Sequence, residues 1–253
     1  YCEEYKKNYI EIQDFGNNTI YQILKNNDND KFSYYKKIIK ILNQIQSIKN
    51  RSIKNFKNKV FKISKYKKEI LIEEANLFCD WYVKKNLLKK KRKAFIKKFK
   101  KIVKKLSLSL KLKNNVFVHR DYHVSNLMMV NNQIGIIDSQ DALIGNRAYD
   151  LASLIDDVRF KTSKKFKDKI YKFYLKKQKK LDKIKFKNDF EILSILRNLK
   201  IIGIFTRLAV RDKKKKYLRL IPYAWKLIDM RINENQIFTD LKELLYQNFK
   251  RKN

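Results

Sequence analysis

The chain has 253 residues, of which 44% are hydrophobic and 34% charged, and its formal net charge is +37. This apolar content can fill the core of one large domain or two lobes, which excludes a disordered polyelectrolyte. Cys2 and Cys79 are the only cysteines, so a disulfide framework and a Cys-rich zinc site are excluded, and a reducing, cytoplasmic setting is expected. No apolar run of ~18 residues occurs, so no membrane span is expected.

The positive charge has two interpretations. A basic stripe would indicate a surface for nucleic acid or for an anionic membrane. The lysines are instead spread over every expected helix, so we interpret the charge as a compositional bias without a specific nucleic-acid or membrane partner. The chain begins at Tyr1 without a methionine, and we expect it to be part of a longer protein.

The expected elements follow from hydrophobic periodicity. Apolar and polar residues alternate over 9–16 as in a strand, and a turn is expected at 16–18. Residues 26–30 are expected to form a polar loop and residues 49–64 a basic loop. We expect a kink or a helix start at Pro222, the only proline. Helices are expected at 19–25, 32–48, 66–88, 89–112, 149–159, 163–180, 186–211, 213–231 and 236–250. A turn at Gly145 and Asn146 is expected before the helix at 149–159, and the pattern after Asp141 is helical to the end.

The central segment is the most informative part of the chain. Val116 to Met128 and Gly135 to Ala142 are typical of strand, polar loop, strand, turn and strand, and they contain Asp121, Asn126 and Asp138. This is the spacing of a phosphoryl-transfer site. One Asp receives the acceptor hydroxyl, while the Asn and the second Asp offer the oxygen ligands that Mg²⁺ requires.

Each of these residues also has a structural interpretation. Asp121 could satisfy backbone N–H groups in a turn, Asn126 could form an Asx-turn, and Asp138 could cap the end of a strand. Their joint spacing favours the functional interpretation over the separate ones. His119 and His123 are the only histidines, and they flank a loop without a third ligand, so zinc is rejected.

The residues from His119 to Met128, with Ile137 and Asp138, resemble the aminoglycoside phosphotransferase and choline kinase family, which has a protein-kinase-like fold. Further segments are most similar to its branch of anomeric sugar kinases acting on N-acetylmuramate and N-acetylglucosamine. These segments are Glu74 to Tyr82, Asp138 to Ala142 with Gly145, Tyr149 to Leu154, and Gly203 to Leu208 followed by Arg211-Asp212 and Tyr217-Leu218.

The resemblance implies an α+β fold: a protein-kinase-like C-terminal lobe that is mainly helical, with a small β-hairpin region at the active site. Residues 1–18 would be the end of the N-terminal lobe and its hinge strand. Residues 19–253 would be the C-terminal lobe, with a catalytic loop at 119–126 and a metal-binding segment at 134–142. The rest of the N-terminal lobe would be largely absent from this chain.

The resemblance also implies roles for particular residues, with ATP and Mg²⁺ as cofactors and a small molecule, an amino sugar, as substrate. Asp121 would be catalytic, and Asn126 and Asp138 would hold the metal. Glu11 and Gln13 would meet adenine through backbone groups. His119 and Asp150 would support the catalytic loop. Substrate contacts would come from His123, Asp141, Glu74, Trp81 and Arg207.

The chain departs from the family pattern in several places. No Gly-rich loop and no strand lysine precede Tyr9, Ser139 replaces an aromatic residue, and Arg120 stands where small-molecule kinases usually have glycine. No Phe-Gly follows Asp138 and no Ala-Pro-Glu segment is present, so the pattern favours a small-molecule kinase over a protein kinase. A catalytically inert kinase-fold binding protein and a basic RNA-binding protein stay as alternatives. The sequence determines neither the acceptor nor the oligomeric state.

Overall fold

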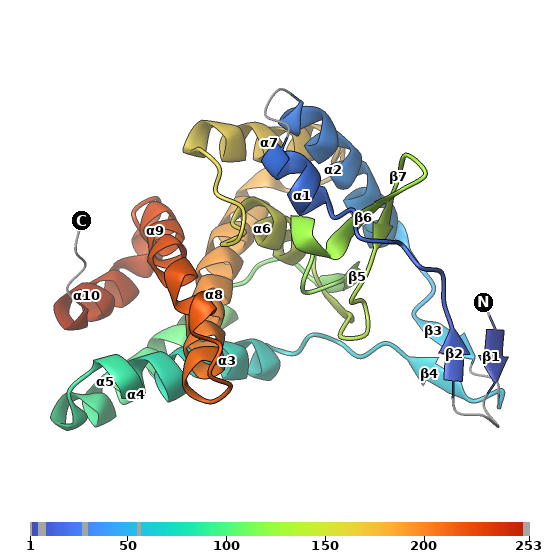
Figure 1. Cartoon of the computed structure of the whole chain (residues 1–253). Coiled ribbons are helices and arrows are strands. Elements are labelled where there is room, and N and C mark those ends of the chain that lie inside the picture. Colours follow the sequence, from blue (N-terminus) through green and yellow to red (C-terminus); the bar gives the residue numbers. More distant parts are fainter. Residues whose placement is uncertain (1, 5–8, 27–29, 55–56, 250–253) are drawn as a thin grey trace.

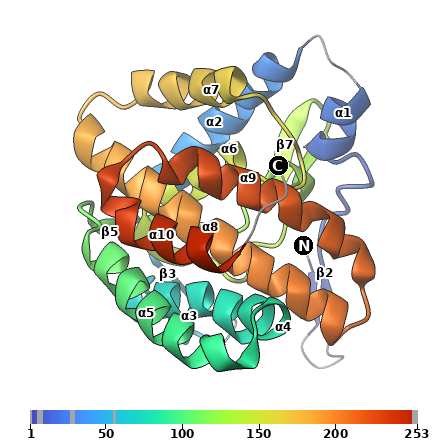
Figure 2. The same cartoon turned by 90° about the vertical axis from the view of Figure 1, so that its left-hand side faces the viewer.

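A computed structural model describes residues 2–4, 9–26, 30–54 and 57–249 of the chain. It shows a helical body with small two-stranded sheets, built around the long helix α8 (Lys183–Val210; Figures 1 and 2). Apolar residues lie on all faces of α8, which is the pattern of a buried helix. The remaining helical elements are α1 (Ile20–Asn26), α2 (Lys31–Ser47), α3 (Lys68–Leu77), α4 (Lys84–Asn86), α5 (Lys89–Leu108), α6 (Ala148–Ile155), α7 (Lys164–Lys176), α9 (Ile221–Ile232) and α10 (Thr239–Asn248).

The helices agree with the sequence prediction in type and position. The helix expected at 66–88 is continuous but changes to π-helical geometry over Phe78–Val83 (η2). Pro222 lies in the first turn of α9, so the expected helix start is confirmed; the 3₁₀ segment η4 (Lys215–Leu220) precedes it. A second 3₁₀ segment, η5 (Gln236–Phe238), precedes α10. No helix among the described residues is long and apolar enough to cross a membrane.

The first strand prediction is correct only in part. Strand β2 spans Tyr9–Glu11 and pairs antiparallel with β1 (Cys2–Glu4), whereas residues 12–18 form no strand. The turn expected at 16–18 is present: Gly16 has a φ of 66°, and its N–H donates to the Asp14 carboxylate. A short side-chain turn of this kind competes with strand geometry. Part of the expected loop at 26–30 lies outside the described residues.

Two further predictions are wrong. Residues 49–64 contain the antiparallel hairpin β3 (Ser52–Lys54) and β4 (Val60–Lys62), where a loop was expected. Residues after Asp141 begin with a strand, β8 (Leu143–Asn146), where a turn and helix were expected. Gly145 and Asn146 favour a turn locally, but the chain pairs here with β5 (Asn114–Val118), so tertiary pairing overrides local preference.

The central segment has the expected alternation of strands and loops. After β5, the 3₁₀ segment η3 (Val124–Asn126) leads into the hairpin of β6 (Leu127–Val130) and β7 (Gln133–Ile136). Asn131 and Asn132 join these strands with φ values of 46° and 61°, which is the geometry of a tight hairpin turn. The incoming N-terminal segment lies against this hairpin, because Met129 N–H donates to the Asn18 carbonyl at 2.8 Å.

Candidate active site

The loop after β5 is held by one buried carboxylate. Asp150, in the first turn of α6, is fully buried and accepts hydrogen bonds from the backbone N–H of His119 (2.7 Å) and of Arg120 (3.0 Å). Arg120 has a left-handed φ of 75°. The loop therefore turns sharply where its N–H groups meet Asp150, and Asp121 follows this turn. The hydrogen bonds expected of Asp150 are present.

Backbone groups of Ile137 connect the two other predicted site residues to this loop. The Ile137 N–H donates to the Asn126 carbonyl at 3.1 Å, and the Ile137 carbonyl accepts from Nε2 of His119 at 2.9 Å. Asn126 Nδ2 donates to the Asp121 carbonyl at 3.1 Å. Asp138 is the residue after Ile137, so Asp121, Asn126 and Asp138 lie on three segments joined by direct hydrogen bonds.

Asp121 is half-buried in a cationic environment. Burial by itself raises the pKa of Asp121, but the charges of Arg197 and Lys200, with His123 and Arg159, hold this pKa below its usual value. The carboxylate is therefore ionised at neutral pH. An ionised Asp can accept a hydrogen bond from an alcohol and receive its proton.

Asn126 and Asp138 have the donor chemistry that a magnesium ion on nucleotide phosphates requires. Asn126 uses its amide nitrogen toward Asp121, so Oδ1 is the atom that can face a cation. Asp138 is exposed and has a φ of 61°, a conformation that Asp tolerates better than most residues. The described residues hold no group of three His, Cys, Asp or Glu side chains suited to a metal. One carboxylate, one amide oxygen and phosphate oxygens are the ligand set expected for Mg²⁺ here.

Glu74 lies beside the candidate catalytic loop (residues 119–126), within an internal network. Its carboxylate accepts from Tyr66 Oη and from Arg120, and Oε1 also lies 2.9 Å from Lys200 Nζ. Although burial raises its pKa, Lys200, Tyr66 and Arg120 together hold the pKa of Glu74 below its usual value. Arg120 also lies over the Tyr66 ring. Glu74 thus links α3, α8 and the catalytic loop, and its predicted contact with substrate stays a prediction.

The two histidines are both buried but have different surroundings. His119 is fixed by its bond to Ile137 and by an edge contact with the Tyr122 ring, which agrees with a support role. His123 Nδ1 has no hydrogen-bond partner among the described residues. Burial lowers the pKa of His123 to about 4, so this imidazole is neutral at physiological pH.

The other predicted site residues are less closely placed. Asp141 is exposed, and its carbonyl accepts from Arg120 Nη1 at 3.0 Å. Trp81 is half-buried on η2, and Arg207 is half-buried on α8, about 10 Å along the axis from Lys200. Gln13 is exposed on the segment after β2, and Glu11 is described only by its backbone pairing with Cys2.

The sequence prediction missed four residues of the site: Lys200 and Arg197 on α8, Arg159 after α6, and Tyr66 before α3. Basic residues within the otherwise apolar α8 were the available signal, because a cation inside a buried helix needs a reason. In a chain with 62 Lys and Arg residues this signal is weak.

The fold is similar to that of two solved structures. A choline/ethanolamine kinase family protein from Mesorhizobium loti superposes with a TM-score of 0.57 at 9% identity, covering 92% of this chain and 70% of that one. A spectinomycin phosphotransferase in an AMP-bound complex superposes with a TM-score of 0.56 at 13% identity, covering 87% and 71%. The predicted kinase-like fold class is therefore confirmed.

Sequence comparison identifies the family. The profile described as the phosphotransferase enzyme family matches residues 9–185, so the chain belongs to this family. It is 34% identical to N-acetylmuramate/N-acetylglucosamine kinase of Neisseria meningitidis serogroup B, over 63% of this chain and 50% of that protein. It is 31% identical to the Pseudomonas aeruginosa protein of the same name, over 71% and 55%. The predicted family resemblance is confirmed, and the chain spans about half the length of these relatives.

Proposed function

We propose that the protein is an ATP-dependent kinase that transfers the γ-phosphoryl group to a hydroxyl of an amino sugar, of the N-acetylmuramate or N-acetylglucosamine type. The observation that carries this proposal is the hydrogen-bonded assembly of Asp121, Asn126 and Asp138 through Ile137. The names of the sequence relatives supply the acceptor class. The chain would contribute the acceptor-binding and metal-binding side of the site.

Asp121 would orient the acceptor hydroxyl and take its proton late in the transfer. Its lowered pKa keeps it in the form that accepts this hydrogen bond. The loop is fixed because the backbone N–H groups of His119 and Arg120 donate to Asp150. The carboxylate of Asp121 therefore needs little reorganisation when substrate binds. Positioning of this kind supplies much of the catalysis in phosphoryl transfer, which asks little covalent chemistry of the protein.

Asn126 Oδ1 and Asp138 would hold Mg²⁺, which when bound neutralises charge on the β- and γ-phosphates. The backbone of residues 11–13 would face adenine, since this segment leads directly to the β6–β7 hairpin that ends near both ligands. Phe15 packs against Gly135 of β7, where an added Cβ would lie 2.6 Å from the ring. This contact would hold the nucleotide segment and the metal segment in register.

The decisive test is Asp121→Asn in the full chain as it is encoded. We expect phosphoryl transfer to N-acetylglucosamine to fall by at least about a hundredfold, because a general base typically contributes ~10²–10⁴-fold. Mg·ATP binding, measured by calorimetry, should persist in this variant. Circular dichroism melting should show a folded protein, because the substitution keeps the shape of the side chain and the backbone carbonyl that accepts from Asn126.

The same measurements separate the alternatives. A wild-type protein that binds Mg·ATP without transferring phosphate would be an inert kinase-fold binding protein. A protein that binds neither Mg·ATP nor sugar, but binds RNA with a steep dependence on salt, would be a basic RNA-binding protein. Substantial transfer by the Asp121→Asn variant would contradict the role given to Asp121.

A further inference from the structure

One face of α8 lies along the active site. Ser194, Arg197 and Lys200 are spaced three residues apart, so they lie on the same side of the helix. Ser194 Oγ donates to Asp156 at 2.6 Å, at the C-terminal end of α6. Lys200 Nζ donates to Glu74, the partner of Arg120 in the catalytic loop. Arg197 lies between these two contacts along the helix, and its charge is the largest of those that lower the pKa of Asp121.

Arg197 is buried without a partner. Arg197 is 3% exposed and its Nη1 is fully buried, and the guanidinium makes no hydrogen bond or ion pair with any described residue. Burying an unpaired cation is costly, so proteins retain one where it has a use. The charge of Arg197 is felt by Asp121 and His123, although no direct bond joins them.

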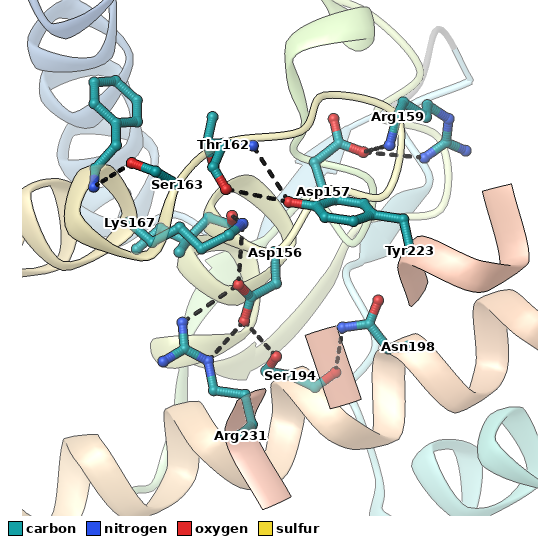
Figure 3. A network of polar contacts seen from close by, with 12 residues as sticks. Asp156, Asp157, Arg159, Thr162, Ser163, Lys167, Ser194, Asn198, Tyr223 and Arg231 are labelled. Atoms are coloured by element: carbon teal, nitrogen blue, oxygen red, sulfur yellow. Dashed lines mark hydrogen bonds and ion pairs between the residues drawn. The ribbon is translucent and has the colours of Figure 1, made fainter. Parts of the chain in front are cut away.

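Arg231 shows what a structural arginine looks like in this protein. It is 5% exposed, close to the value for Arg197, but it donates to Asp156 at 2.9 and 3.3 Å. Figure 3 shows Asp156 between Arg231 and Lys167, with Ser194 also bonded to it. Two arginines of similar burial thus differ in one respect: Arg231 is satisfied by a carboxylate of the chain, and Arg197 is not.

The surroundings of Arg197 are suited to an anion. Arg159 supplies a second positive charge and lies 3.6 Å from Asp157, toward which it points in Figure 3. The side chain of His123 offers a buried Nδ1 without a partner among the described residues. Asp157 keeps one oxygen without a donor, so the acidic groups here do not use the guanidinium of Arg197.

The position of Arg197 indicates which substrate it would meet. The proposed metal ligand Asp138 is joined to the loop on the side of His119, through Ile137. The charge of Asp138 acts on His119, whereas the charge of Arg197 on α8 acts on Asp121, His123 and Asp150. A ligand bound to Arg197 would therefore lie beside Asp121, the residue to which we assign the acceptor hydroxyl.

We propose that Arg197 forms a carboxylate-binding subsite for the acceptor, which makes an acidic amino sugar the preferred substrate. The inference rests on the proposed kinase function and deepens it. N-acetylmuramate carries a carboxylate on its lactyl ether, and N-acetylglucosamine is the same sugar without it. A guanidinium with free donors can bind a carboxylate through two parallel hydrogen bonds, which a neutral sugar cannot replace.

The test compares the two sugars in the full chain as it is encoded, with Arg197→Met, Arg197→Lys and Lys226→Met variants. The readout is the ratio of kcat/KM for N-acetylmuramate to kcat/KM for N-acetylglucosamine. We expect Arg197→Met to lower this ratio about tenfold, the size of one charged hydrogen-bonded contact, mainly through the KM for N-acetylmuramate. Arg197→Lys keeps the charge without the planar fork and should recover part of the ratio.

Lys226 is exposed on α9 and controls for the loss of one positive charge from a highly basic protein, so Lys226→Met should leave the ratio as in the wild type. An effect on any shared catalytic step, such as the ionisation of Asp121, cancels in the ratio. Equal losses with both sugars would overturn the subsite while leaving the kinase function intact. A wild-type protein that phosphorylates neither sugar would overturn both.

Folding is checked in parallel against Arg231→Met. Arg231→Met removes the ion pair between Arg231 and Asp156 and leaves Asp156 with Lys167 alone, so it should lower the melting temperature markedly. Arg197→Met removes an unpaired cation and should lower it far less. Equal destabilisation by the two substitutions would show that Arg197 has a structural partner, and the subsite would be wrong.

Discussion

The carboxylate of Glu74 on α3 pairs with the guanidinium of Arg120 in the candidate catalytic loop. Arg120 has a φ of 75°, which costs a non-glycine residue about 1–2 kcal/mol. Small-molecule kinases usually have glycine here, and the geometry gives the reason, because glycine adopts this conformation freely. Glu74 and the Asp141 carbonyl hold Arg120 where a glycine would need no support.

A double-mutant cycle tests this pairing. Glu74→Gln should lower the free energy of unfolding by about 2–4 kcal/mol, because it leaves Arg120 and Lys200 without their shared carboxylate. Arg120→Gly should cost less, since the relief of backbone strain offsets part of the lost ion pair. Urea denaturation of both single variants and the double variant gives the coupling energy. Strictly additive losses would mean that the two side chains do not stabilise each other.

The pH dependence of stability should show Asp150 and Glu74 acting in opposite directions. Burial raises the pKa of Asp150 from 3.8 to about 7, so its contribution is full below pH 3.8 and is lost as the pH rises through about 7. The pKa of Glu74 is lowered by Lys200, Tyr66 and Arg120 against the effect of burial. Its contribution is therefore present above pH 4.5 and is lost as the pH falls through the folded-state pKa.

Denaturant titrations between pH 5 and pH 8 measure the Asp150 effect. The stability of the wild type relative to Asp150→Asn should decrease across this range and become constant above it, because the amide introduced by the substitution cannot titrate. A flat difference would show that Asp150 stays ionised throughout, held by its two backbone N–H donors.

Much of this fold could be predicted from the sequence, because long amphipathic or apolar segments specify helices strongly. The loop and the hairpin expected in the central segment are also present, and the spacing of Asp121, Asn126 and Asp138 was the signal that drew attention to this segment. Strand β8 could not be predicted in this way. Gly145 and Asn146 favour a turn, and only the partner strand, almost 30 residues earlier, makes them extended.

The residues that α8 contributes to the candidate site could not be predicted from the sequence, for a similar reason. Lys200 and Arg197 are separated from the catalytic loop by more than 70 residues, and nothing in their local pattern distinguishes them from other lysines and arginines. Glu74 was noticed as a site residue, but its partners Tyr66, Arg120 and Lys200 became visible only in three dimensions.

Asp138→Asn should separate metal binding from folding. The side chain is exposed, and Asn adopts a φ of 61° as readily as Asp, so the melting temperature should change little. Loss of the charged oxygen ligand should weaken nucleotide binding in the presence of Mg²⁺ by about tenfold or more.

Calorimetry with ATP, with and without EDTA, measures this effect. In the wild type EDTA should weaken binding, and in Asp138→Asn it should have little further effect. A variant that retains the full Mg²⁺ dependence would show that Asp138 is not a ligand of the ion.

Any residue larger than glycine at position 203 of α8 should destabilise the protein. A Cβ built there would overlap the Leu77 carbonyl group and lie 2.6 Å from Phe78 N, where α3 passes into the π-helical segment η2. Gly203→Ala should lower the free energy of unfolding by about 1–3 kcal/mol despite the better helix propensity of alanine, because two backbones must separate. Gly135→Ala is the matched control: the nearest atoms to its Cβ belong to the Phe15 ring, a side chain that can rotate away. Urea denaturation should therefore show a larger loss for Gly203→Ala than for Gly135→Ala, and the opposite order would mean that α8 does not approach α3 this closely.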